Sequence, residues 1–519
     1  MIDPRGGNGG AAGPRHPVGL DTLLAAIPER ELLGPLPATV RGLTDDSRRV
    51  TPGSCFVAVR GLRVDGRRFI PQAVERGARA VVAEPPDPCP GQAVGRILVP
   101  DTRRALPRLA DAYFGHPSRA LIVVGVTGTN GKTTTAYLCE ALLRARGLAT
   151  GLVGTIQYVV RGHAREASQT TPEALELQAL LAEMVAAGVG GVAMEVSSHA
   201  LELRRVDGVA FDVAVFTNLT QDHLDFHGTM ERYAAAKGRL FRELLPAGGK
   251  PCPTAVLNGD DPVGAALAAE PGIRALTFGL APERAIHPLR FQSDLEGIRL
   301  EAVTPAGPVR IASRLIGEHN VMNLLGAVGV GVALGLAPER IAAALGEVAA
   351  VPGRFERVEA GQDFLVVVDY AHTPDALRRV LETARRLTPG RLGVVFGAGG
   401  DRDRAKRPLM GRIAATLADR VWLTSDNPRS EDPRAIIAEI AAGVVPPPRD
   451  GYTSDPDRRE AIRAALAWAR RGDTVVVAGK GHETYQIVAG QVLPFDDRVV
   501  ARECLSARPG GRASGTCPG

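Results

Sequence analysis

A glycine-rich stretch in the first third of the chain has the residue types and spacing to bind phosphate. It covers residues 125–134 and reads G-V-T-G-T-N-G-K-T-T. An apolar run at 120–124 precedes it, and a helical pattern from Thr133 to Arg146 follows it. Where a strand leads through such a turn into a helix, backbone N–H groups and the positive end of the helix dipole face a bound anion. The stretch therefore predicts a site for nucleotide phosphates.

Two side chains of this loop supply further chemistry. Lys132 can reach the terminal phosphates of a nucleotide, and the Thr133 hydroxyl can ligate a magnesium ion. The general P-loop pattern has a glycine six residues before the lysine, whereas this chain has Val126 there, so the loop is a variant of the motif. The alternative interpretation is a glycine turn with a solvated lysine, which the flanking apolar and helical segments disfavour.

Polar side chains also follow two later apolar runs. The run at 191–196 contains Glu195 near its end, and the run at 211–217 leads to Asp222 and His223. Open parallel sheets bind their ligands at the carboxyl ends of the strands. A carboxylate and an imidazole near bound phosphates suit a divalent cation, and magnesium bridges phosphates through oxygen ligands. Two such ends after a phosphate loop favour a metal site over the alternative, a polar helix cap at each strand end.

Lysine is rare in this chain. Of the 62 lysines and arginines only five are lysine, namely Lys132, Lys237, Lys250, Lys406 and Lys480. The two cations differ in shape, hydration and pKa, so a lysine kept in an arginine-rich chain is a candidate for a role that arginine cannot fill. For Lys237, which lies in a helical pattern, the alternative interpretation is an exposed helix lysine.

The last third of the chain contains four more polar motifs, each after a predicted strand. They cover residues 369–374, 397–408, 426–429 and 479–483. Their carboxylates, arginines and asparagine suit a zwitterionic ligand, because arginine binds a carboxylate bidentately and acidic side chains hold an ammonium group. The alternative is a set of surface ion pairs, in particular for Arg404 and Arg407.

The elements that position these motifs alternate between strands and helices, which predicts an α/β fold. Near-continuous apolar strands, of the kind buried on both faces of a parallel sheet, are expected at 191–196, 211–217, 254–257, 364–369, 392–396, 421–424 and 474–478. A more polar, antiparallel stretch is expected at 274–315, and a helix at 320–334. The last segment is predicted to be a second nucleotide-binding-like domain.

Length and composition indicate a globular protein of about three domains. We expect a disordered extension at 1–17, α/β domains at 18–118, 119–351 and 352–506, and a disordered tail at 507–519. Hydrophobic residues make up 45% of the chain and charged residues 23%, which is ordinary for a globular protein. No apolar run reaches the ~18 residues needed to span a bilayer, so no membrane insertion is expected.

Charge and cysteine spacing narrow the function further. The net charge is +5, but no Lys/Arg block with interleaved aromatic residues occurs, so we expect anionic small-molecule ligands and no nucleic acid. The six cysteines are scattered without a C-x-x-C pair. That argues against a zinc site or a disulfide framework and favours a reducing cytoplasm.

Taken together, these motifs resemble the Mur ligases of peptidoglycan synthesis over residues 43–497. The variant loop T-G-T-N-G-K-T-T, the segment E-V-S-S-H-A-L from Glu195 and the segment N-L-x-x-D-H-L-D-x-H-G from Asn218 are typical of that family. The resemblance implies three domains, with a central P-loop ATPase-like parallel sheet and a C-terminal Rossmann-like domain. The motif Asp426-Asn-Pro-Arg429 resembles that of members which add meso-diaminopimelate, because lysine-adding relatives lack the terminal arginine.

The resemblance also implies roles for individual residues. It assigns ATP binding to Gly128, Thr129, Asn130, Gly131, Lys132, Thr133, Thr134, Asn320, Arg354 and Asp369. It assigns magnesium binding to Thr133, Glu195, His223 and a carbamylated Lys237, and catalysis to Lys132, Lys237 and His223. It assigns the UDP-muramoyl-dipeptide to Ser47, Thr170, Thr171, Ser197 and Arg205, with Leu62–Val64 near Ser47. It assigns diaminopimelate to Arg402, Asp426, Asn427, Pro428, Arg429, Gly479 and Glu483. Gln169 and Leu203 depart from the family's common asparagine and glutamine.

The implied activity is an ATP-dependent ligation on UDP-N-acetylmuramoyl-L-alanyl-D-glutamate, carried out by a monomer. ATP phosphorylates the D-glutamyl γ-carboxylate, the amine of diaminopimelate attacks the acyl phosphate, and phosphate leaves. Three alternatives stay open at this point: the same ligase using L-lysine, a folylpolyglutamate-synthase-like ligase, and a non-catalytic ATP-binding regulator. The Ser47 region and the Asp426–Arg429 motif disfavour the second. The joint presence of Lys132, Glu195, His223 and Lys237 disfavours the third.

Overall fold

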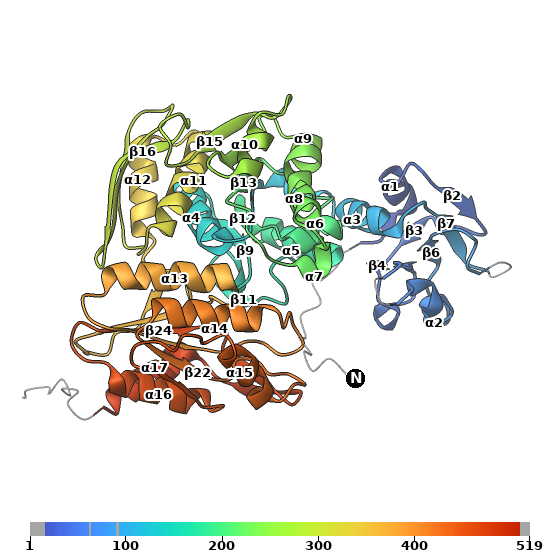
Figure 1. The fold of residues 1–519 in the computed structure, drawn as a ribbon. Helices are drawn as coiled ribbons and strands as arrows, with labels where there is room; N and C mark the ends of the chain where they lie inside the picture. The colour runs from blue at the N-terminus through green and yellow to red at the C-terminus, as the bar shows by residue number, and fades with distance from the viewer. Residues whose placement is uncertain (1–15, 62–63, 90–92, 509–519) are drawn as a thin grey trace, which may run out of the picture. The chain divides into compact units, whose positions relative to one another are not determined.

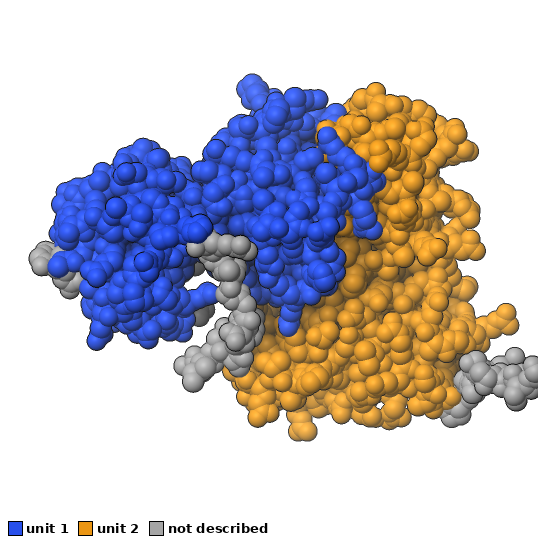
Figure 2. All heavy atoms as spheres, turned by 180° about the vertical axis from the view of Figure 1, so that it is seen from behind, with its two compact units in different colours: residues 1–128, 142–216, 231–277 blue, residues 129–141, 217–230, 278–519 orange. Residues whose placement is uncertain are grey.

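A computed structural model of the protein describes residues 16–61, 64–89 and 93–508, which have a mixed α/β fold, as predicted (Figure 1). They form two compact units, shown in separate colours in Figure 2. Unit 1 contains Met1–Gly128, Leu142–Phe216 and Glu231–Thr277, and unit 2 contains Thr129–Ala141, Thr217–Met230 and Phe278–Gly519. Most of the extensions predicted at 1–17 and 507–519, and part of the predicted contact Leu62–Val64, lie outside the described residues. The predicted domain boundaries stay a prediction.

Unit 1 begins with a small α/β part built on a five-stranded sheet of order β2-β7-β6-β5-β4, in which β4 to β7 are parallel and β2 is antiparallel. Alternate residues of its strands pack on opposite faces: Val57 and Val82 lie in one apolar cluster, and Phe56 and Val81 in another. Both faces are therefore buried, as expected for parallel strands. The elements of this part are β1 (Val18–Gly19), α1 (Leu20–Ala25), β2 (Glu31–Leu33), β3 (Thr39–Val40), β4 (Gly42–Thr44), η1 (Ser47–Arg49), β5 (Ser54–Val57), η2 (Gly66–Phe69), α2 (Ile70–Glu75), β6 (Ala80–Ala83), β7 (Gly95–Leu98), α3 (Thr102–Tyr113) and η3 (Pro117–Ala120).

The next part of the chain builds an eight-stranded sheet of order β11-β10-β9-β12-β8-β13-β14-β15. Its centre is parallel, and the register pairs Glu195 with Val126 and Phe216 with Thr127. The ends of β12 and β13 therefore flank the end of β8, where the glycine-rich loop begins. The elements between 122 and 278 are β8 (Ile122–Thr127), α4 (Lys132–Ala145), β9 (Thr150–Val153), β10 (Gln157–Val160), β11 (His163–Glu166), α5 (Ala174–Ala186), β12 (Gly191–Glu195), α6 (Ser198–Glu202), β13 (Val213–Phe216), α7 (Leu224–His227), α8 (Met230–Arg239), the π-helical η4 (Leu240–Leu244), α9 (Leu245–Ala247), β14 (Thr254–Asn258), α10 (Pro262–Ala268) and β15 (Ala275–Phe278).

Unit 2 contains an antiparallel three-stranded sheet made of β16 (His287–Asp294), β17 (Gly297–Val303) and β18 (Val309–Ser313). Two helices follow, α11 (His319–Ala333) and α12 (Pro338–Glu347). The predicted antiparallel stretch is thus present, except that its first strand, β15, lies at the edge of the eight-stranded sheet.

The rest of unit 2 is a six-stranded sheet of order β19-β20-β24-β21-β22-β23 with helices on both faces. Its strands β20 to β24 are parallel, and only the short edge strand β19 is antiparallel. The elements are β19 (Glu356–Arg357), β20 (Leu365–Asp369), α13 (Pro374–Leu387), β21 (Leu392–Phe396), α14 (Lys406–Leu417), β22 (Arg420–Leu423), α15 (Pro433–Ala441), β23 (Tyr452–Ser454), α16 (Arg458–Trp468), β24 (Thr474–Ala478), β25 (Tyr485–Val488), β26 (Gln491–Pro494) and α17 (Asp497–Ser506).

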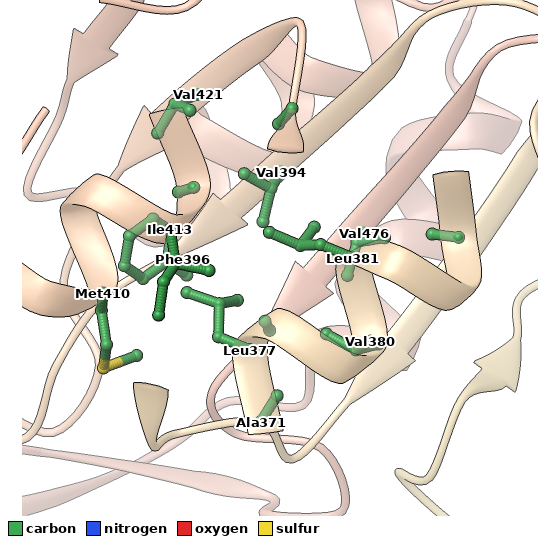
Figure 3. Close-up of a cluster of buried hydrophobic side chains, with 14 of the residues drawn as sticks. Ala371, Leu377, Val380, Leu381, Val394, Phe396, Met410, Ile413, Val421 and Val476 are labelled. Atoms are coloured by element: carbon green, nitrogen blue, oxygen red, sulfur yellow. The ribbon is translucent and has the colours of Figure 1, made fainter. Parts of the chain in front are cut away.

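Apolar packing on this sheet fixes the strand ends that carry the polar motifs. On one face, Leu377 and Leu381 of α13 and Ile413 of α14 lie with Val394 and Val476 of the strands (Figure 3). On the other face, α16 and α17 cover alternate strand residues in a second apolar cluster. In the described residues, no helix is long and apolar enough to cross a membrane. The β25–β26 hairpin, the β9–β11 meander and α17 are present although the sequence pattern did not predict them.

A buried ion pair lies behind the carboxyl ends of β22 and β24. Arg458 and Asp497 both have fully buried side chains, and their closest nitrogen–oxygen distance is 2.6 Å. The same guanidinium donates to the carbonyl oxygens of Ser425 and Ala478, at 3.2 and 2.9 Å. The pair therefore connects α16 and α17 to the two strand ends from which the motifs at 426–429 and 479–483 begin.

We predict that Asp497→Ala lowers the free energy of unfolding by about 3–5 kcal/mol, because it leaves the Arg458 charge buried without its partner. Urea unfolding followed by tryptophan fluorescence measures this, since both tryptophans, Trp422 and Trp468, lie in this part of unit 2 with ring centroids 5.4 Å apart. Glu460→Ala, which breaks an exposed ion pair with Arg463, is the control and should leave the unfolding curve unchanged. Equal curves for Asp497→Ala and the parent would contradict the prediction.

Candidate active site

The glycine-rich loop joins β8 to α4, as predicted, and its conformation depends on glycine. Gly131 has a φ of +84°, and an ideal Cβ there would lie 2.3 Å from Oδ1 of Asn323. Gly128 has a φ of +148°. No larger residue fits at Gly131 without displacing the asparagine, so the first turn of α4 keeps the close backbone packing that an anion site needs.

Polar residues after β13 hold the loop in place within unit 2. The backbone N–H groups of Thr129 and Asn130 donate to the carbonyl and side-chain oxygens of Asn218, at 2.8 and 3.0 Å. The Thr217 hydroxyl donates to the carbonyl of Asn130 at 2.6 Å. Asn130 also donates through Nδ2 to the carboxylate of Asp375, at 2.9 Å. Side chains from two other segments thus fix the loop that the sequence identified.

The two side chains expected at the phosphates lie within this loop network. Nζ of Lys132 donates to the carbonyl of Thr129 at 2.8 Å, and Nη2 of Arg354 donates to the Thr133 hydroxyl at 3.1 Å. The Arg354 guanidinium also lies over the ring of Tyr370, 4.7 Å from its centroid. Arg354 is therefore next to the phosphate loop, as expected from the resemblance.

Asn320 and Asp369 have mainly structural contacts here. Asn320 donates to the Ile316 carbonyl and accepts from Nδ2 of Asn323, both at 2.8 Å. Asp369 accepts from the backbone N–H groups of Phe355 and Ala371, at 2.7 and 2.8 Å, which holds the segment that carries Arg354. Burial raises the pKa of Asp369, against the opposing effect of Arg354. The asparagine that contacts the loop is Asn323, three residues after the predicted Asn320.

In unit 1 a polar cluster gathers at the end of β12. Both carboxylate oxygens of Glu195 accept from Thr155, at 2.8 and 3.0 Å, and the Thr155 hydroxyl is 3.1 Å from that of Thr170. The Thr171 hydroxyl donates to the Glu195 carbonyl at 2.8 Å and accepts from the Ser197 backbone at 3.1 Å. Predicted residues that are up to 27 positions apart in the sequence, from Thr170 to Ser197, are therefore brought together.

Arg205 lies against the same threonine segment. Its Nη1 donates to the Thr171 carbonyl at 3.2 Å and to the side chain of Gln169. Its Nη2 lies 2.6 Å from the Glu173 carboxylate. Gln169, which departs from the family pattern, thus has a hydrogen-bonding role beside Arg205. Ser47 lies in the five-stranded part of unit 1, buried, and donates to Oε1 of Gln72 at 2.7 Å.

Lys237 is buried in unit 1, with 1% of its surface exposed. Its Nζ donates to the carbonyl of Gly128 at 2.8 Å and lies 4.5 Å from the ring centroid of Tyr233. The alternative interpretation of an exposed helix lysine is therefore wrong. This amine points at the start of the phosphate loop, where a branched guanidinium would not have the same fit.

The motifs at 426–429 and 479–483 meet at the carboxyl edge of the six-stranded sheet. Nδ2 of Asn427 donates to Glu483 at 2.8 Å, and the fully buried Lys480 donates to Asn427 and Glu483, at 3.2 and 2.9 Å. An ideal Cβ on Gly479, which has a φ of +113°, would lie 2.6 Å from Oδ2 of Asp426. Four of the predicted residues therefore form one cluster, together with Lys480.

The Asp426 carboxylate is the most deeply buried acid of this cluster. Its Oδ2 is buried and has no hydrogen-bond partner among the residues that the structure describes. Burial opposes its ionisation, but Lys480 and Arg458 nearby lower its pKa overall.

The loop that carries Arg429 is held by the β25–β26 hairpin. Gln486 donates to the Asp426 carbonyl at 2.7 Å, and the Ile487 backbone donates to the Asn427 side chain at 3.0 Å. The Arg429 backbone donates to the Ile487 carbonyl at 3.0 Å. The hairpin therefore holds Asp426, Asn427 and Arg429 of the predicted motif, and Pro428 lies between them in the chain. Arg402 is exposed in the neighbouring loop.

Two neutral imidazoles, His372 and His482, lie on either side of the Tyr370 ring. Burial lowers the pKa of His372 to about 4 and that of His482 to about 3, so neither is charged near pH 7. The ring of Tyr370 lies 4.6 Å from His372 and 4.9 Å from His482 between centroids. Lys406 donates to the His372 carbonyl at 3.0 Å. The positive charges around these neutral rings belong to Arg354 and Lys406, with Arg498 and Lys480 near His482.

The four residues predicted to bind magnesium are divided between the two units. Glu195 and Lys237 belong to unit 1, and Thr133 and His223 belong to unit 2. In the described part of the chain, no group of three or more His, Cys, Asp or Glu side chains forms a metal site by itself.

Several residues of these networks were not predicted from the sequence. Asn323, Asp375 and Gln486 contact the predicted loops from helices α11 and α13 and from the hairpin. A signal existed for Asn323, which is polar in an otherwise apolar helix, and for Lys480, one of the five lysines. Asp375 follows Thr373 and Pro374 at a helix start, where a capping role is the ordinary interpretation.

Comparison with known proteins agrees with this geometry. Three family models match: "Mur ligase family, catalytic domain" at residues 39–114, "Mur ligase middle domain" at 126–331, and "Mur ligase, glutamate ligase domain" at 353–481. A UDP-N-acetylmuramoyl-L-alanyl-D-glutamate–2,6-diaminopimelate ligase of Solibacter usitatus is 50% identical over 466 residues, covering 90% of this chain and 93% of the relative. The enzyme of the same name from Gloeobacter violaceus is 51% identical over 470 residues, covering 90% and 94%.

Solved structures show the same fold. One of a UDP-N-acetylmuramoyl-L-alanyl-D-glutamate–2,6-diaminopimelate ligase has a TM-score of 0.65 at 35% identity, covering 90% of this chain and 95% of the other. Folylpolyglutamate synthase of Mycobacterium tuberculosis has a TM-score of 0.61 at 20% identity, covering 79% and 95%, and shares the fold alone. These relatives are 50% and 51% identical to the chain over 90% of its length. The chain therefore belongs to the Mur ligase family, whose members are ATP-dependent, amide-bond-forming ligases.

Proposed function

We propose that this protein adds meso-diaminopimelate to the D-glutamyl γ-carboxylate of UDP-N-acetylmuramoyl-L-alanyl-D-glutamate, with hydrolysis of ATP to ADP and phosphate, in peptidoglycan precursor synthesis. The observation that carries the choice of amino acid is the cluster formed by the Asp426–Arg429 loop with Gly479, Lys480 and Glu483. The relatives at 50% and 51% identity bear the name of the same activity.

The cluster has the charges that diaminopimelate requires. This amino acid carries an ammonium and a carboxylate at each end, whereas lysine has no carboxylate at its distal end. Arg429 and Arg402 offer guanidinium groups, which bind carboxylates bidentately. Asp426 and Glu483 offer acceptors for an ammonium group. A site built only for lysine would leave these arginines without an anionic partner.

ATP binds at residues 128–134 in this proposal, with its terminal phosphates at the start of α4. Lys132 and Arg354 neutralise the phosphate charge, and Asn320 acts through its hydrogen bond to Asn323. Thr170, Thr171, Ser197 and Arg205 hold the muramoyl-peptide, and Ser47 holds the uridine diphosphate. Asp369 positions the segment that carries Arg354.

The reaction proceeds in two chemical steps. An oxygen of the D-glutamyl γ-carboxylate attacks the γ-phosphorus of ATP, ADP leaves, and an acyl phosphate forms. The amine of diaminopimelate then adds its lone pair to the acyl carbon, and the tetrahedral intermediate expels inorganic phosphate as the amine loses a proton. The protein positions the reactants and neutralises charge, which are the main contributions an enzyme makes to phosphoryl transfer.

Magnesium fits the residues that would hold it, namely Glu195, His223, the Thr133 hydroxyl and a carbamylated Lys237. When bound, the ion would offset the negative charge that builds up on the transferred phosphate. Carbamylation converts the Lys237 ammonium into a carboxylate-like group, which arginine cannot form. Lys237 is buried beside the Gly128 carbonyl in a chain that otherwise uses arginine. This supports a role, such as carbamylation, that requires the amine of lysine.

The proposal also takes the protein to be a monomer in the cytoplasm. The scattered cysteines support a reducing compartment. Light scattering on the purified protein tests the oligomeric state.

An amino-acid panel tests the proposed substrate directly. With UDP-N-acetylmuramoyl-L-alanyl-D-glutamate and ATP, we expect phosphate release with meso-diaminopimelate well above that with L-lysine. Arg429→Ala should raise KM for diaminopimelate about ten- to hundredfold, because hydrogen bonds to charged groups contribute about 1.5–3 kcal/mol. Turnover of lysine above that of diaminopimelate by the parent would reject the proposal, and turnover of a folate and glutamate instead would favour a folylpolyglutamate-synthase-like activity.

A substitution at Lys237 tests the carbamate. Lys237→Ala should lower kcat about a hundredfold, a typical loss for one electrostatic contact in a transition state, with partial rescue by formate or acetate. Lys237→Arg keeps the positive charge but cannot be carbamylated, so it should be as inactive as Lys237→Ala. NMR of protein given isotope-labelled bicarbonate should show a carbamate carbon in the parent alone. Normal activity of either variant would contradict the modification.

A glycine substitution tests the loop. Gly131→Ala should abolish detectable ADP binding by calorimetry, because its Cβ would overlap Oδ1 of Asn323. Gly147→Ala is the matched control: Gly147 has a φ of +87°, close to the +84° of Gly131, but no atom lies within 4 Å of its ideal Cβ. ADP affinity equal to the parent's in Gly131→Ala would show that the loop does not need this close approach.

A further inference from the structure

Arg407 has a fully buried guanidinium, although a surface ion pair was the alternative interpretation of this residue from the sequence. It lies in the first turn of α14, and none of its side chain is exposed. Nη1 donates to Glu431 and Glu439, at 2.9 and 2.7 Å, and Nη2 donates to Glu431 and to the Gly399 carbonyl, at 2.8 and 3.1 Å. The surface-pair interpretation is therefore wrong for Arg407, although it holds for Arg404, whose side chain is 65% exposed.

Glu431 connects Arg407 to a second loop. Besides accepting from Arg407, its Oε1 accepts from the backbone N–H of Asp401 at 2.6 Å. The hydrogen bonds from Arg407 lower the pKa of Glu431 to about 2, so its carboxylate is ionised throughout the physiological range. One carboxylate thus joins α14, the loop at 397–405 and the loop at 424–432.

These two loops pack directly against each other along their length. The Gly400 backbone donates to the Asn427 carbonyl at 2.9 Å, and Nη1 of Arg429 donates to the Gly400 carbonyl at 2.7 Å. Asp401 accepts from the hydroxyl of Ser430 at 2.7 Å. The loop at 397–405 carries Arg402, and the loop at 424–432 carries Arg429. The packing of these two loops sets the spacing between the two guanidinium groups, and Arg407 supports both loops through Glu431 and Gly399.

The backbone of both loops needs outside support. Asp401 and Arg429 have φ values of +52° and +55°, a region that non-glycine residues rarely adopt. An ideal Cβ on Gly400 would lie 1.9 Å from the Pro428 carbonyl oxygen, so the loops are in the closest contact that a glycine allows. Such conformations persist only where surrounding contacts hold them. The Arg407–Glu431 contact is the charged, buried part of that support.

We propose that Arg407 is a positioning residue for the amino-acid substrate: through Glu431 it holds the Arg402 loop against the Arg429 loop and so determines selectivity for an amino acid with a distal carboxylate. This inference rests on the proposed function. Arg407 does not touch the substrate; its planar, forked donors meet acceptors on three segments at once, which a lysine could not do. If the two loops moved apart, both guanidinium groups would be misplaced, and small misplacements of binding groups cost much affinity.

The test is Arg407→Lys, which keeps the charge and loses the fork, assayed by phosphate release in the full-length protein. We expect KM for meso-diaminopimelate to rise about tenfold or more, the usual loss when a supporting residue behind a binding group is changed. We expect kcat to change much less, KM for ATP to stay at the parent value, and the preference for diaminopimelate over L-lysine to fall. Arg404→Lys, in the same loop and also bonded to Glu439, is the matched control and should match the parent in every constant.

Thermal melting and ADP affinity show whether each variant is folded. If Arg407→Lys does not fold, Glu431→Gln carries the test, because glutamine keeps one acceptor oxygen but removes the charge at a partly exposed position. We then expect a smaller rise in KM for meso-diaminopimelate. A KM for diaminopimelate equal to the parent's in the folded variant, or an equal rise in KM for ATP, would overturn the positioning role. Failure of the proposed function gives a different result: the unmodified protein itself would not use diaminopimelate.

Discussion

Buried charges that must be paired organise the substrate edge of the six-stranded sheet. Arg458 and Lys480 are fully buried, and an unpaired charge at such a position would cost several kcal/mol. Each has a carboxylate partner, Asp497 for Arg458 and Glu483 for Lys480. Because the same groups also donate to Ser425, Ala478 and Asn427, pairing the charges places the loops. The positions of Asp426, Gly479 and Glu483 therefore follow from the need to neutralise the interior.

Features formed by residues that are close together in the sequence could be predicted. The strand, glycine turn and helix around Lys132 follow one another along the chain, so the phosphate loop could be identified, and the polar ends of β12 and β13 flank it as parallel pairing requires. Apolar runs at 392–396 and 474–478 predicted buried strands because both faces of that sheet are covered.

Contacts between distant segments could not be predicted in the same way. Asn323 and Asp375 reach the loop from helices nearly 200 and 245 residues away. Asn323 differs from its neighbours only in being polar in an apolar helix, and Asp375 looks like an ordinary residue at a helix start, so neither local sequence shows which loop it contacts. The strands of the β25–β26 hairpin have four residues each, too few for a clear alternation, and yet the hairpin holds Asp426, Asn427 and Arg429. Arg407 looked like any exposed arginine, because burial is a property of the folded surroundings.

The scarcity of lysine has a practical consequence for chemical labelling. All five lysines lie in the described residues, and none is exposed: each packs into a loop network or the interior. An amine-directed acylating reagent therefore has no ordinary surface target on the body of this protein. Lys132, Lys250 and Lys406 are partly accessible, whereas Lys237 and Lys480 are buried. An arginine-rich surface thus confines a common, unselective reaction to three amines at most in the folded, described part of the chain, one of them beside the phosphate loop.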